Sequence, residues 1–277
     1  MRLSIIIITW NVKTLLYDCL KSLDVSHLPS DWEIVIFDNA SSDGTVAMLK
    51  EQFPHVKTLV NGKNIGYAAG NNLAASHAVG DYIFFLNPDT LASQTSVRQL
   101  LAYMDEHLQV GACSPGLLLP DETPQPYSFG QDPTPIYLLR RGLHRLLHNR
   151  PLHDWDVATP QTVDWVSGAA MLVRREAWER TGGFDENFFM YFEDNDLCLR
   201  MRQFGWEIVY YPQTTIIHLG GRSQRQNPMA QKAYNQSLLY FYRKHYGIVY
   251  SKLIGLPLWV YHKNVMTSLR NTENSTQ

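Results

Sequence analysis

The stretch "IFDNASSDGTVAMLK", residues 36–50, changes from a strand pattern to a helix pattern within a few residues. The apolar run 33–38 ends in Asp38, and a helix is predicted from about Ser42. Asp38 and Asn39 stand where the strand runs out into a Ser/Gly turn. Such residues commonly close turns and cap helices, which is one interpretation. The other interpretation is a carboxylate placed to bind a ligand. Motifs elsewhere in the chain are needed to choose between the two.

The same alternation runs through the first half of the chain. Apolar runs that predict strands occupy residues 3–10, 33–38, 56–60 and 81–87. Helical spacing follows from about residues 12, 42, 67 and 93. Continuous apolar strands separated by helices predict an α/β fold, with a mostly parallel central sheet flanked by helices. Ligands bind such sheets at the carboxyl ends of the strands, where Thr9, Asn11, Asp38 and Asp89 are expected to lie.

The pattern changes in the second half. Residues 120–160 hold several prolines and a basic amphipathic piece, 137–150, and are predicted to form an irregular insertion. A strand and a short helix, an acidic helix, another strand and a helix at about 230–246 follow, in that order. We therefore expect one domain over residues 1–246, with an amphipathic C-terminal extension and a flexible tail at 247–277.

Composition excludes several classes of protein. Of the 277 residues, 45% are hydrophobic and 18% are charged, which is the balance of a folded chain. The net charge of −2 gives no case for a nucleic-acid partner. Cys19, Cys113 and Cys198 are scattered, so we expect apolar fillers in a reducing compartment. Because no apolar run is long enough to span a membrane, we expect a cytoplasmic protein, with contact at the inner face of the plasma membrane left open.

A glycine- and asparagine-rich loop precedes the third predicted helix. It reads "NGKNIGYAAGNN", residues 61–72, and contains Asn64, Gly66 and Asn71. Such a loop can bring backbone N–H groups close to an anionic ligand, although a flexible connection is the simpler interpretation. The glycine-rich GxGxxG pattern does not follow the first strand, so side chains would have to read any bound nucleotide.

Two separate residues are candidates for a metal site. In "LNPDT", residues 86–90, Pro88 stiffens the turn that carries Asp89, whose carboxylate suits a hard divalent cation or a helix cap. His218 follows a strand-like run in "IIHLGG". A lone histidine is usually structural, so His218 is a metal ligand only if Asp89 lies nearby.

The acidic segment "FEDNDLCLRMRQFG", residues 192–205, is a candidate for the catalytic base. Glu193, Asp194 and Asp196 lie in the first turn of a predicted helix, where the helix dipole favours acids for stability alone. They also follow the aromatic run "FFMYF", and desolvation there would raise a carboxyl pKa toward the range of a general base.

In this order the motifs resemble the inverting glycosyltransferases of family 2, which have the GT-A fold. The matching stretches are "SIIIITWN", "FDNASSDGT", "NIGYAAGNN", "FLNPDT", "VSGAAMLVRREAWERTGGFDENFFMYFEDNDLCLRMRQFGW" and "HLGG". The resemblance covers residues 3 to about 246. It is greatest to bacterial rhamnosyltransferases of surface-polysaccharide and O-antigen assembly, which use dTDP-L-rhamnose.

The resemblance implies a role for each candidate residue. Asp194 matches the catalytic base that deprotonates the acceptor, with Glu193 as its rival. Asp89 would hold Mg²⁺ or Mn²⁺ on the donor diphosphate, and His218 would complete that site. The nucleotide-sugar donor would be bound by Thr9, Asn11, Asp38, Asn39, Asn64, Gly66, Asn71, Asn87 and Asp89. Asn87 departs from the family pattern, which has an acid there.

The acceptor would be a saccharide, free or lipid-linked. The arginines of 137–150 and the aromatic residues of 248–263 suit an anionic membrane surface, although ordinary packing explains them equally. Two alternatives stay open: a family 2 transferase that uses a UDP-hexose, and a non-catalytic nucleotide-sugar or glycan-binding protein on the same fold. The sequence does not indicate the oligomeric state.

Overall fold

The computed structural model describes residues 1–149, 152–220 and 228–254. Its strands are β1 (Leu3–Thr9), β2 (Trp32–Asp38), β3 (Lys57–Val60), β4 (Tyr82–Leu86), β5 (Thr90–Leu91), β6 (Val110–Leu118), β7 (Phe129–Gly130), β8 (Gln161–Thr162), β9 (Trp165–Val166), β10 (Ala170–Arg174) and β11 (Glu207–His218). Its α-helices are α1 (Lys13–Ser22), α2 (Thr45–Gln52), α3 (Tyr67–Ser76), α4 (Gln94–Glu106), α5 (Pro135–His148), α6 (Arg175–Thr181), α7 (Glu193–Gln203) and α9 (Pro228–Tyr246). A 3₁₀ turn lies at Val25–His27, and a last helical segment follows at 248–254.

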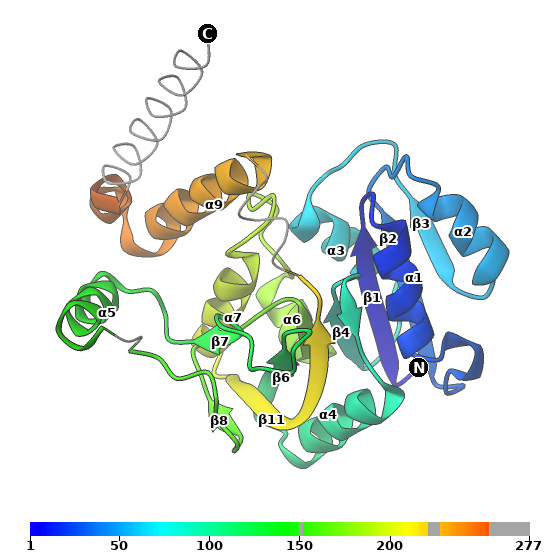
Figure 1. The fold of residues 1–277 in the computed structure, drawn as a ribbon, viewed down its shortest axis with the longest axis horizontal. Coiled ribbons are helices and arrows are strands. Elements are labelled where there is room, and N and C mark those ends of the chain that lie inside the picture. The colour runs from blue at the N-terminus through cyan, green and yellow to red at the C-terminus, as the bar shows by residue number, and fades with distance from the viewer. Residues whose placement is uncertain (150–151, 221–227, 255–277) are drawn as a thin grey trace, which may run out of the picture.

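The main sheet has the strand order β3-β2-β1-β4-β10-β6-β11-β5, with β8 paired to β11 (Figure 1). Strands β1 to β4 are parallel, as the sequence predicts. The second half is mixed, because β10 runs antiparallel to both β4 and β6. An apolar run buried on both faces reads the same in either direction, so the pattern of β10 could not reveal its orientation. Strand β11 also extends past the predicted 207–212, with register shifts along its pairing to β6.

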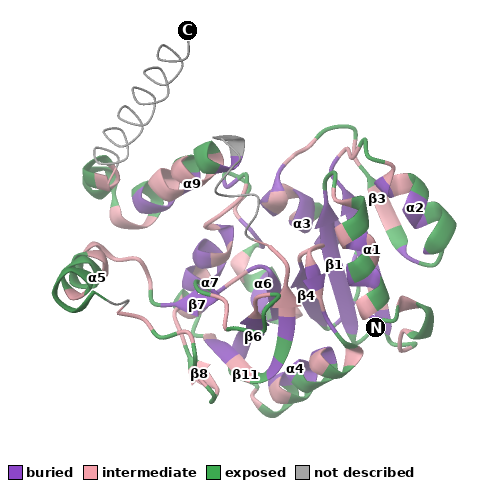
Figure 2. Cartoon of the chain, viewed as in Figure 1, coloured by how far each residue is buried: buried purple, intermediate pink, exposed green. Residues whose placement is uncertain are grey.

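The sheet separates two layers of helices. On β1, Leu3, Ile5 and Ile7 pack toward α1, α2 and α4. Ile6 and Ile8 pack on the opposite face, toward α3, α6, α7 and α9. The central strands β1, β2, β4, β6 and β10 are accordingly buried on both sides (Figure 2). Each fully buried aliphatic side chain stabilises the fold by about 1.5–3 kcal/mol, so this core holds the sheet edge rigidly in place.

The segment predicted to be irregular contains a regular helix. Within residues 120–160, α5 runs from Pro135 to His148 and has no buried residue (Figure 2). Of the predicted extension 247–277, only 247–254 lies within the described residues. No helix in the described part of the chain is long and apolar enough to cross a membrane. The three cysteines are buried and unpaired, as expected of apolar fillers.

Candidate active site

Polar side chains gather at the ends of β1 and β2. Thr9 and Asp38 are register partners, and the Asn39 N–H donates to Thr9 O at 2.8 Å. Asp38 Oδ1 accepts from the Ser41 N–H at 3.0 Å. Asp38 Oδ2 and Thr9 Oγ1 are buried and have no hydrogen-bond partner among the described residues. Because buried polar atoms are nearly always paired, these two oxygens keep Thr9 and Asp38 as candidates for binding a ligand that carries a donor.

Asn39 and Asn64 shape the loop that precedes α3. Asn39 Oδ1 accepts from the Ile65 N–H at 2.8 Å, and its Nδ2 donates to Gly66 O at 3.0 Å. Asn64 Oδ1 accepts from the Gly66 N–H at 2.9 Å. Gly66 has φ of +90°, and a Cβ there would lie 2.5 Å from Phe189 O, so only glycine fits. Asn39 therefore positions the loop with its side chain, while Gly66 allows the loop to approach residue 189.

Asn11 and Asn71 also bond to neighbouring backbone. The exposed Asn11 joins the end of β1 to the turn after β2, because its Oδ1 accepts from the Ser42 N–H at 2.7 Å. Asn71 Nδ2 donates to Tyr67 O at 3.0 Å within α3. Their roles in donor binding stay predictions.

Asp89 and His218 come together although they are far apart in the sequence. His218 Nε2 lies 3.2 Å from Asp89 Oδ1, because β11 pairs with β5 in the register His218 to Thr90. His218 Nδ1 lies 2.8 Å from Gln125 Oε1, which can only accept, so Nδ1 carries the proton. Nε2 and the carboxylate then face each other, an arrangement satisfied by a proton on Nε2 or by a cation between them. The sequence predicted a metal role for His218 only if Asp89 lay nearby, and the two side chains are indeed adjacent.

This pair fits a divalent cation. Mg²⁺ is commonly bound by one or two carboxylates together with water and phosphate oxygens, and imidazole is also a metal ligand. Among the described residues no group of three or more His, Cys, Asp or Glu could hold a metal. A Cβ on Gly220 would lie 2.7 Å from both Asp89 Oδ2 and His218 Nε2, so glycine leaves space beside the pair. Asn87 anchors the turn through its backbone, with its N–H donating to Ala169 O at 2.8 Å.

Asp194 is held at the start of α7 by two backbone donors. Its Oδ2 accepts from the Gly168 N–H at 2.9 Å and its Oδ1 from the Asn195 N–H at 2.8 Å. Burial raises its pKa above the ordinary value, although these two bonds act in the opposite direction. Strand β10 starts where β4 ends, so Gly168 lies at the same sheet edge as Asp89. Asp194 is thus a half-buried carboxylate of raised pKa at the same edge of the sheet as the candidate metal pair.

Glu193 and Asp196 differ from Asp194 in their surroundings. Glu193 is buried, its Oε2 has no partner among the described residues, and burial followed by the charge of Asp194 raises its pKa well above the ordinary value. Asp196 faces α9 and binds Arg200, Lys244 and His245. Burial opposes ionisation of Asp196, but these partners outweigh it and lower its pKa. Asp196 therefore joins two helices, which leaves Asp194 and Glu193 as the candidate bases.

Tyr67 and Gly168 belong to the site and were not predicted from the sequence. The Tyr67 hydroxyl donates to Gly168 O at 2.9 Å. Burial raises the pKa of Tyr67 well above its ordinary value, and the charges of Glu193, Asp194 and Asp89 also raise it. The phenol therefore lies under the influence of both the candidate bases and the metal pair. The only sequence signal was the position of Tyr67 directly after Gly66, at the start of a predicted helix.

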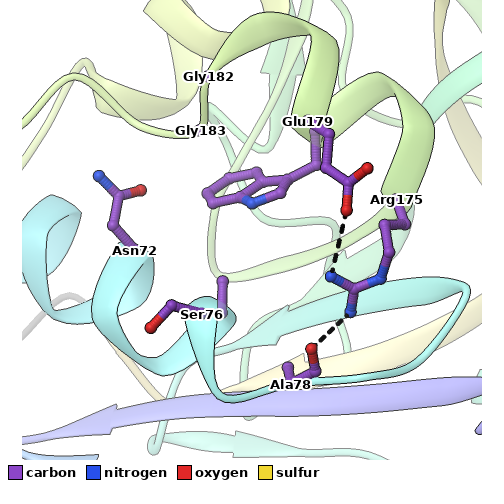
Figure 3. A pocket seen from close by; sticks show the side chains of 9 residues that line it. Asn72, Ser76, Ala78, Arg175, Glu179, Gly182 and Gly183 are labelled. Carbon is purple, nitrogen blue, oxygen red and sulfur yellow. Dashed lines mark hydrogen bonds and ion pairs between the residues drawn. The ribbon is translucent and has the colours of Figure 1, made fainter.

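A separate cavity of about 480 Å³ lies between α3 and α6 (Figure 3). The polar side chains that line it are engaged in intramolecular contacts. Arg175 contacts Ala78 O and Glu179, and the Asn72 side chain is hydrogen-bonded to the backbone of Phe184. None of the candidate site residues lines it. These contacts join each helix to the loop that follows the other, and the cavity adds nothing to the site.

Comparison with known proteins identifies the family. The family model described as "Glycosyl transferase family 2" matches residues 4–153, and the model described as "Glycosyl transferase family group 2" matches residues 82–271. The chain is 31% identical over 229 residues to the N-acetylglucosaminyl-diphospho-decaprenol L-rhamnosyltransferase of Mycobacterium tuberculosis, covering 76% of this chain and 73% of that protein. It is 28% identical over 206 residues to the rhamnosyltransferase WbbL of Escherichia coli, covering 70% and 75% respectively.

Solved structures show the same architecture. S. aureus TarS in complex with UDP-GlcNAc has a TM-score of 0.62 at 15% identity, over 87% of this chain and 65% of that one. The mannosyltransferase PcManGT from Pyrobaculum calidifontis, with GDP-Man and Mn²⁺, has a TM-score of 0.60 at 19% identity, over 91% and 68%. GalNAc-T7 with UDP, GalNAc and Mn²⁺ also has a TM-score of 0.60 at 16% identity, but this chain spans only 44% of its length. These likenesses confirm the GT-A fold. The chain is a glycosyltransferase and belongs to glycosyl transferase family 2.

Proposed function

We propose that the protein transfers L-rhamnose from dTDP-L-rhamnose to a lipid-linked saccharide acceptor during assembly of a cell-surface polysaccharide. The observation that supports the proposal is that Asp194, bonded to the Gly168 N–H, lies at the same sheet edge as the Asp89–His218 pair. The choice of sugar and acceptor is supported by the relatives, two of which are named as rhamnosyltransferases. A lipid-linked acceptor would bring the protein to the inner face of the plasma membrane.

The side chains of Thr9 and Asp38 suit the base of the donor. Thymine presents one ring N–H donor, and Asp38 Oδ2 is a buried acceptor without a partner among the described residues. Thr9 Oγ1, also buried and unpaired there, offers a hydroxyl that can donate or accept. The loop at Asn64 and Gly66 would then lie along the nucleotide, shaped by Asn39.

Asp194 would act as the general base in a single displacement. Its carboxylate takes the proton of the acceptor hydroxyl, and the acceptor oxygen forms a bond to the anomeric carbon. The bond from that carbon to the diphosphate oxygen breaks on the opposite face, so the configuration inverts and dTDP leaves with the bonding electron pair. Asp89 and His218 would hold the divalent cation, which when bound neutralises charge on the leaving diphosphate.

Asp194 is a better base than Glu193 because of its contacts. Two backbone N–H groups stabilise the ionised form of Asp194. The deprotonated carboxylate is therefore available to accept the proton of the acceptor hydroxyl. Glu193 has a buried oxygen without a donor among the described residues, and burial together with the charge of Asp194 raises its pKa and so favours its protonated form. A protonated acid cannot remove a proton from the acceptor.

A donor panel tests the proposal. The purified protein would be incubated with dTDP-L-rhamnose, UDP-GlcNAc, UDP-galactose or GDP-mannose, a lipid diphosphate-linked GlcNAc acceptor, and Mn²⁺ or EDTA. We expect a product with one added deoxyhexose, from dTDP-L-rhamnose alone and only without EDTA. Transfer from a UDP-sugar alone would keep the fold and mechanism but refute the donor. Nucleotide binding without transfer from any donor would identify a non-catalytic binding protein.

A further inference from the structure

Helix α5 presents an apolar face to solvent that nothing among the described residues covers. Its exposed apolar side chains recur at helical spacing and are between 50% and 81% exposed: Ile136, Leu139, Leu143, Leu146 and Leu147. On a helix with a 100° turn per residue these five side chains fall on one side. The whole helix is exposed or half-exposed in Figure 2, whereas β7 is buried. A patch of this kind marks an interaction surface.

The charges of α5 indicate what that surface binds. The helix carries Arg140, Arg141 and Arg145, all exposed, together with His144 and His148, and it has no acidic residue. A leucine-rich face beside a basic face is the pattern of a helix that lies in the interface of an anionic bilayer. We propose that the apolar face of α5 docks on an anionic lipid bilayer, with its leucines among the acyl chains and its arginines at the headgroups.

Two other occupants fit the charges less well. A second copy of the chain, meeting through α5, would bring two basic helices together, which is unfavourable. The C-terminal segment 255–277 contains Lys263, Arg270 and a single acid, Glu273, so its side chains offer no net negative charge to complement α5. A bilayer that contains anionic lipid supplies both the apolar interior and the negative surface.

A second exposed apolar patch supports the same surface. In the segment 248–254, Ile248, Val249, Tyr250 and Leu253 are exposed, and Lys252 lies among them. Figure 1 shows this segment and α5 on the same side of the molecule, away from β1 to β3. Two apolar elements on one side allow a broader contact with a bilayer than one helix alone.

The α5 insertion is fixed relative to the active site by one arginine. Arg202, on α7, binds Asp132 at 2.6 Å, shortly before α5, and Asp164 at 3.3 Å, after β8. The helix that carries Asp194 therefore contacts chain segments on both sides of α5. Docking through α5 would set the orientation of the base above the membrane surface, which suits a lipid-linked acceptor. Only this last step rests on the proposed function.

Vesicle flotation tests the docking without donor or acceptor. The full chain would be mixed with vesicles of phosphatidylglycerol and phosphatidylcholine in equal parts, and with vesicles of phosphatidylcholine alone. We expect flotation with the mixed vesicles, weakened by added salt. The variant Leu143→Ser/Leu147→Ser should bind at least tenfold more weakly, which corresponds to about 1.4 kcal/mol of lost apolar transfer. Arg140→Gln/Arg141→Gln should weaken binding to the mixed vesicles by a similar factor.

Matched controls separate docking from misfolding. Leu73→Ser/Leu108→Ser removes two exposed leucines elsewhere and should bind vesicles like the wild type. Leu143→Ala/Leu147→Ala keeps strong helix formers and should still lose binding.

A wild type that floats with neither vesicle overturns the proposal, as does equal flotation of the α5 variants and the control. If sedimentation shows instead that the α5 variants dissociate a dimer while vesicle binding is unchanged, the face joins two copies and the proposal is wrong. Because flotation needs no turnover, loss of docking and loss of rhamnosyl transfer are observed separately.

Discussion

The backbone N–H of Gly168 donates a hydrogen bond to Asp194 Oδ2 at 2.9 Å. This bond joins the turn before β10 to the first turn of α7, so the carboxylate depends on two elements for its position. The same glycine accepts from the Tyr67 hydroxyl through its carbonyl oxygen, which adds a third element, α3. The orientation of the candidate base is therefore a property of the tertiary fold.

Replacement of the two adjacent acids distinguishes base from bystander. Asp194→Asn should lower kcat by roughly 10²–10⁴, the usual contribution of a general base, while dTDP binding measured by calorimetry is retained. Glu193→Gln should keep kcat near that of the wild type, because glutamine resembles the protonated acid in shape. If Glu193→Gln instead abolished transfer and Asp194→Asn did not, the assignment of the base would be reversed.

Tyr67→Phe tests the hydroxyl as a positioning group. We expect kcat to fall about two- to tenfold, the effect of losing one hydrogen bond of about 0.5–1.5 kcal/mol. A looser Gly168 turn would weaken the bond that lowers the pKa of Asp194, so the acid limb of kcat/KM should move to higher pH. Tyr103→Phe, on α4, is the matched control. An unchanged pH profile would mean that Tyr67 has only a packing role.

Gln125 is expected to set the metal affinity through His218. Its Oε1 lies 2.8 Å from His218 Nδ1 and holds the tautomer whose Nε2 can bind a cation. Gln125→Ala should therefore weaken Mn²⁺ binding, measured by titration calorimetry, by about 10–100-fold. The exposed Gln52→Ala is the control. Equal Mn²⁺ affinity of Gln125→Ala and the wild type would remove His218 from the proposed site.

Asp196→Asn should destabilise the fold by about 3 kcal/mol, because it leaves the charges of Arg200 and Lys244 without their buried partner. The folded-state pKa of Asp196 is lowered, so its stabilising contribution is complete above the ordinary aspartate pKa and is lost as pH falls through the lowered value. Urea unfolding near neutral pH and in acid should show the difference from wild type shrinking in acid. The exposed Asp18→Asn should have almost no effect at either pH.

Glu193 should have the opposite pH dependence. Its folded-state pKa is raised, so between the ordinary glutamate pKa and that raised value the folded protein binds more protons than the unfolded chain. The free energy of unfolding of the wild type should therefore fall as pH rises through this window. Glu193→Gln removes the titrating carboxyl group. The free energy of unfolding of this variant, measured by urea unfolding, should therefore increase relative to that of the wild type as pH rises. A constant difference would show that Glu193 ionises normally.

The local patterns of the first half were sufficient to predict its architecture. The apolar runs became β1 to β4 in parallel, and the helix predicted from about residue 93 is α4, capped by Ser93, whose Oγ accepts from the Ser96 N–H at 3.0 Å. The placement of Asp38 and Asp89 past strand ends also followed from sequence order. These features depend on side-chain periodicity and on neighbouring turns, which are visible in a single stretch of chain.

Only the tertiary structure decided the contacts between distant segments. The antiparallel direction of β10 and the 3.2 Å approach of Asp89 and His218 depend on pairing between distant strands, and the bond from Gly168 to Asp194 joins the turn before β10 to α7. The same holds for Asp196, whose position among the acids of α7 suggested a shared site but whose partners lie on α9. The sequence by itself determined which residues lie in strands, helices and turns, because hydrophobic periodicity is local. Which carboxylate faces the active site depends on packing between elements, which no local pattern records.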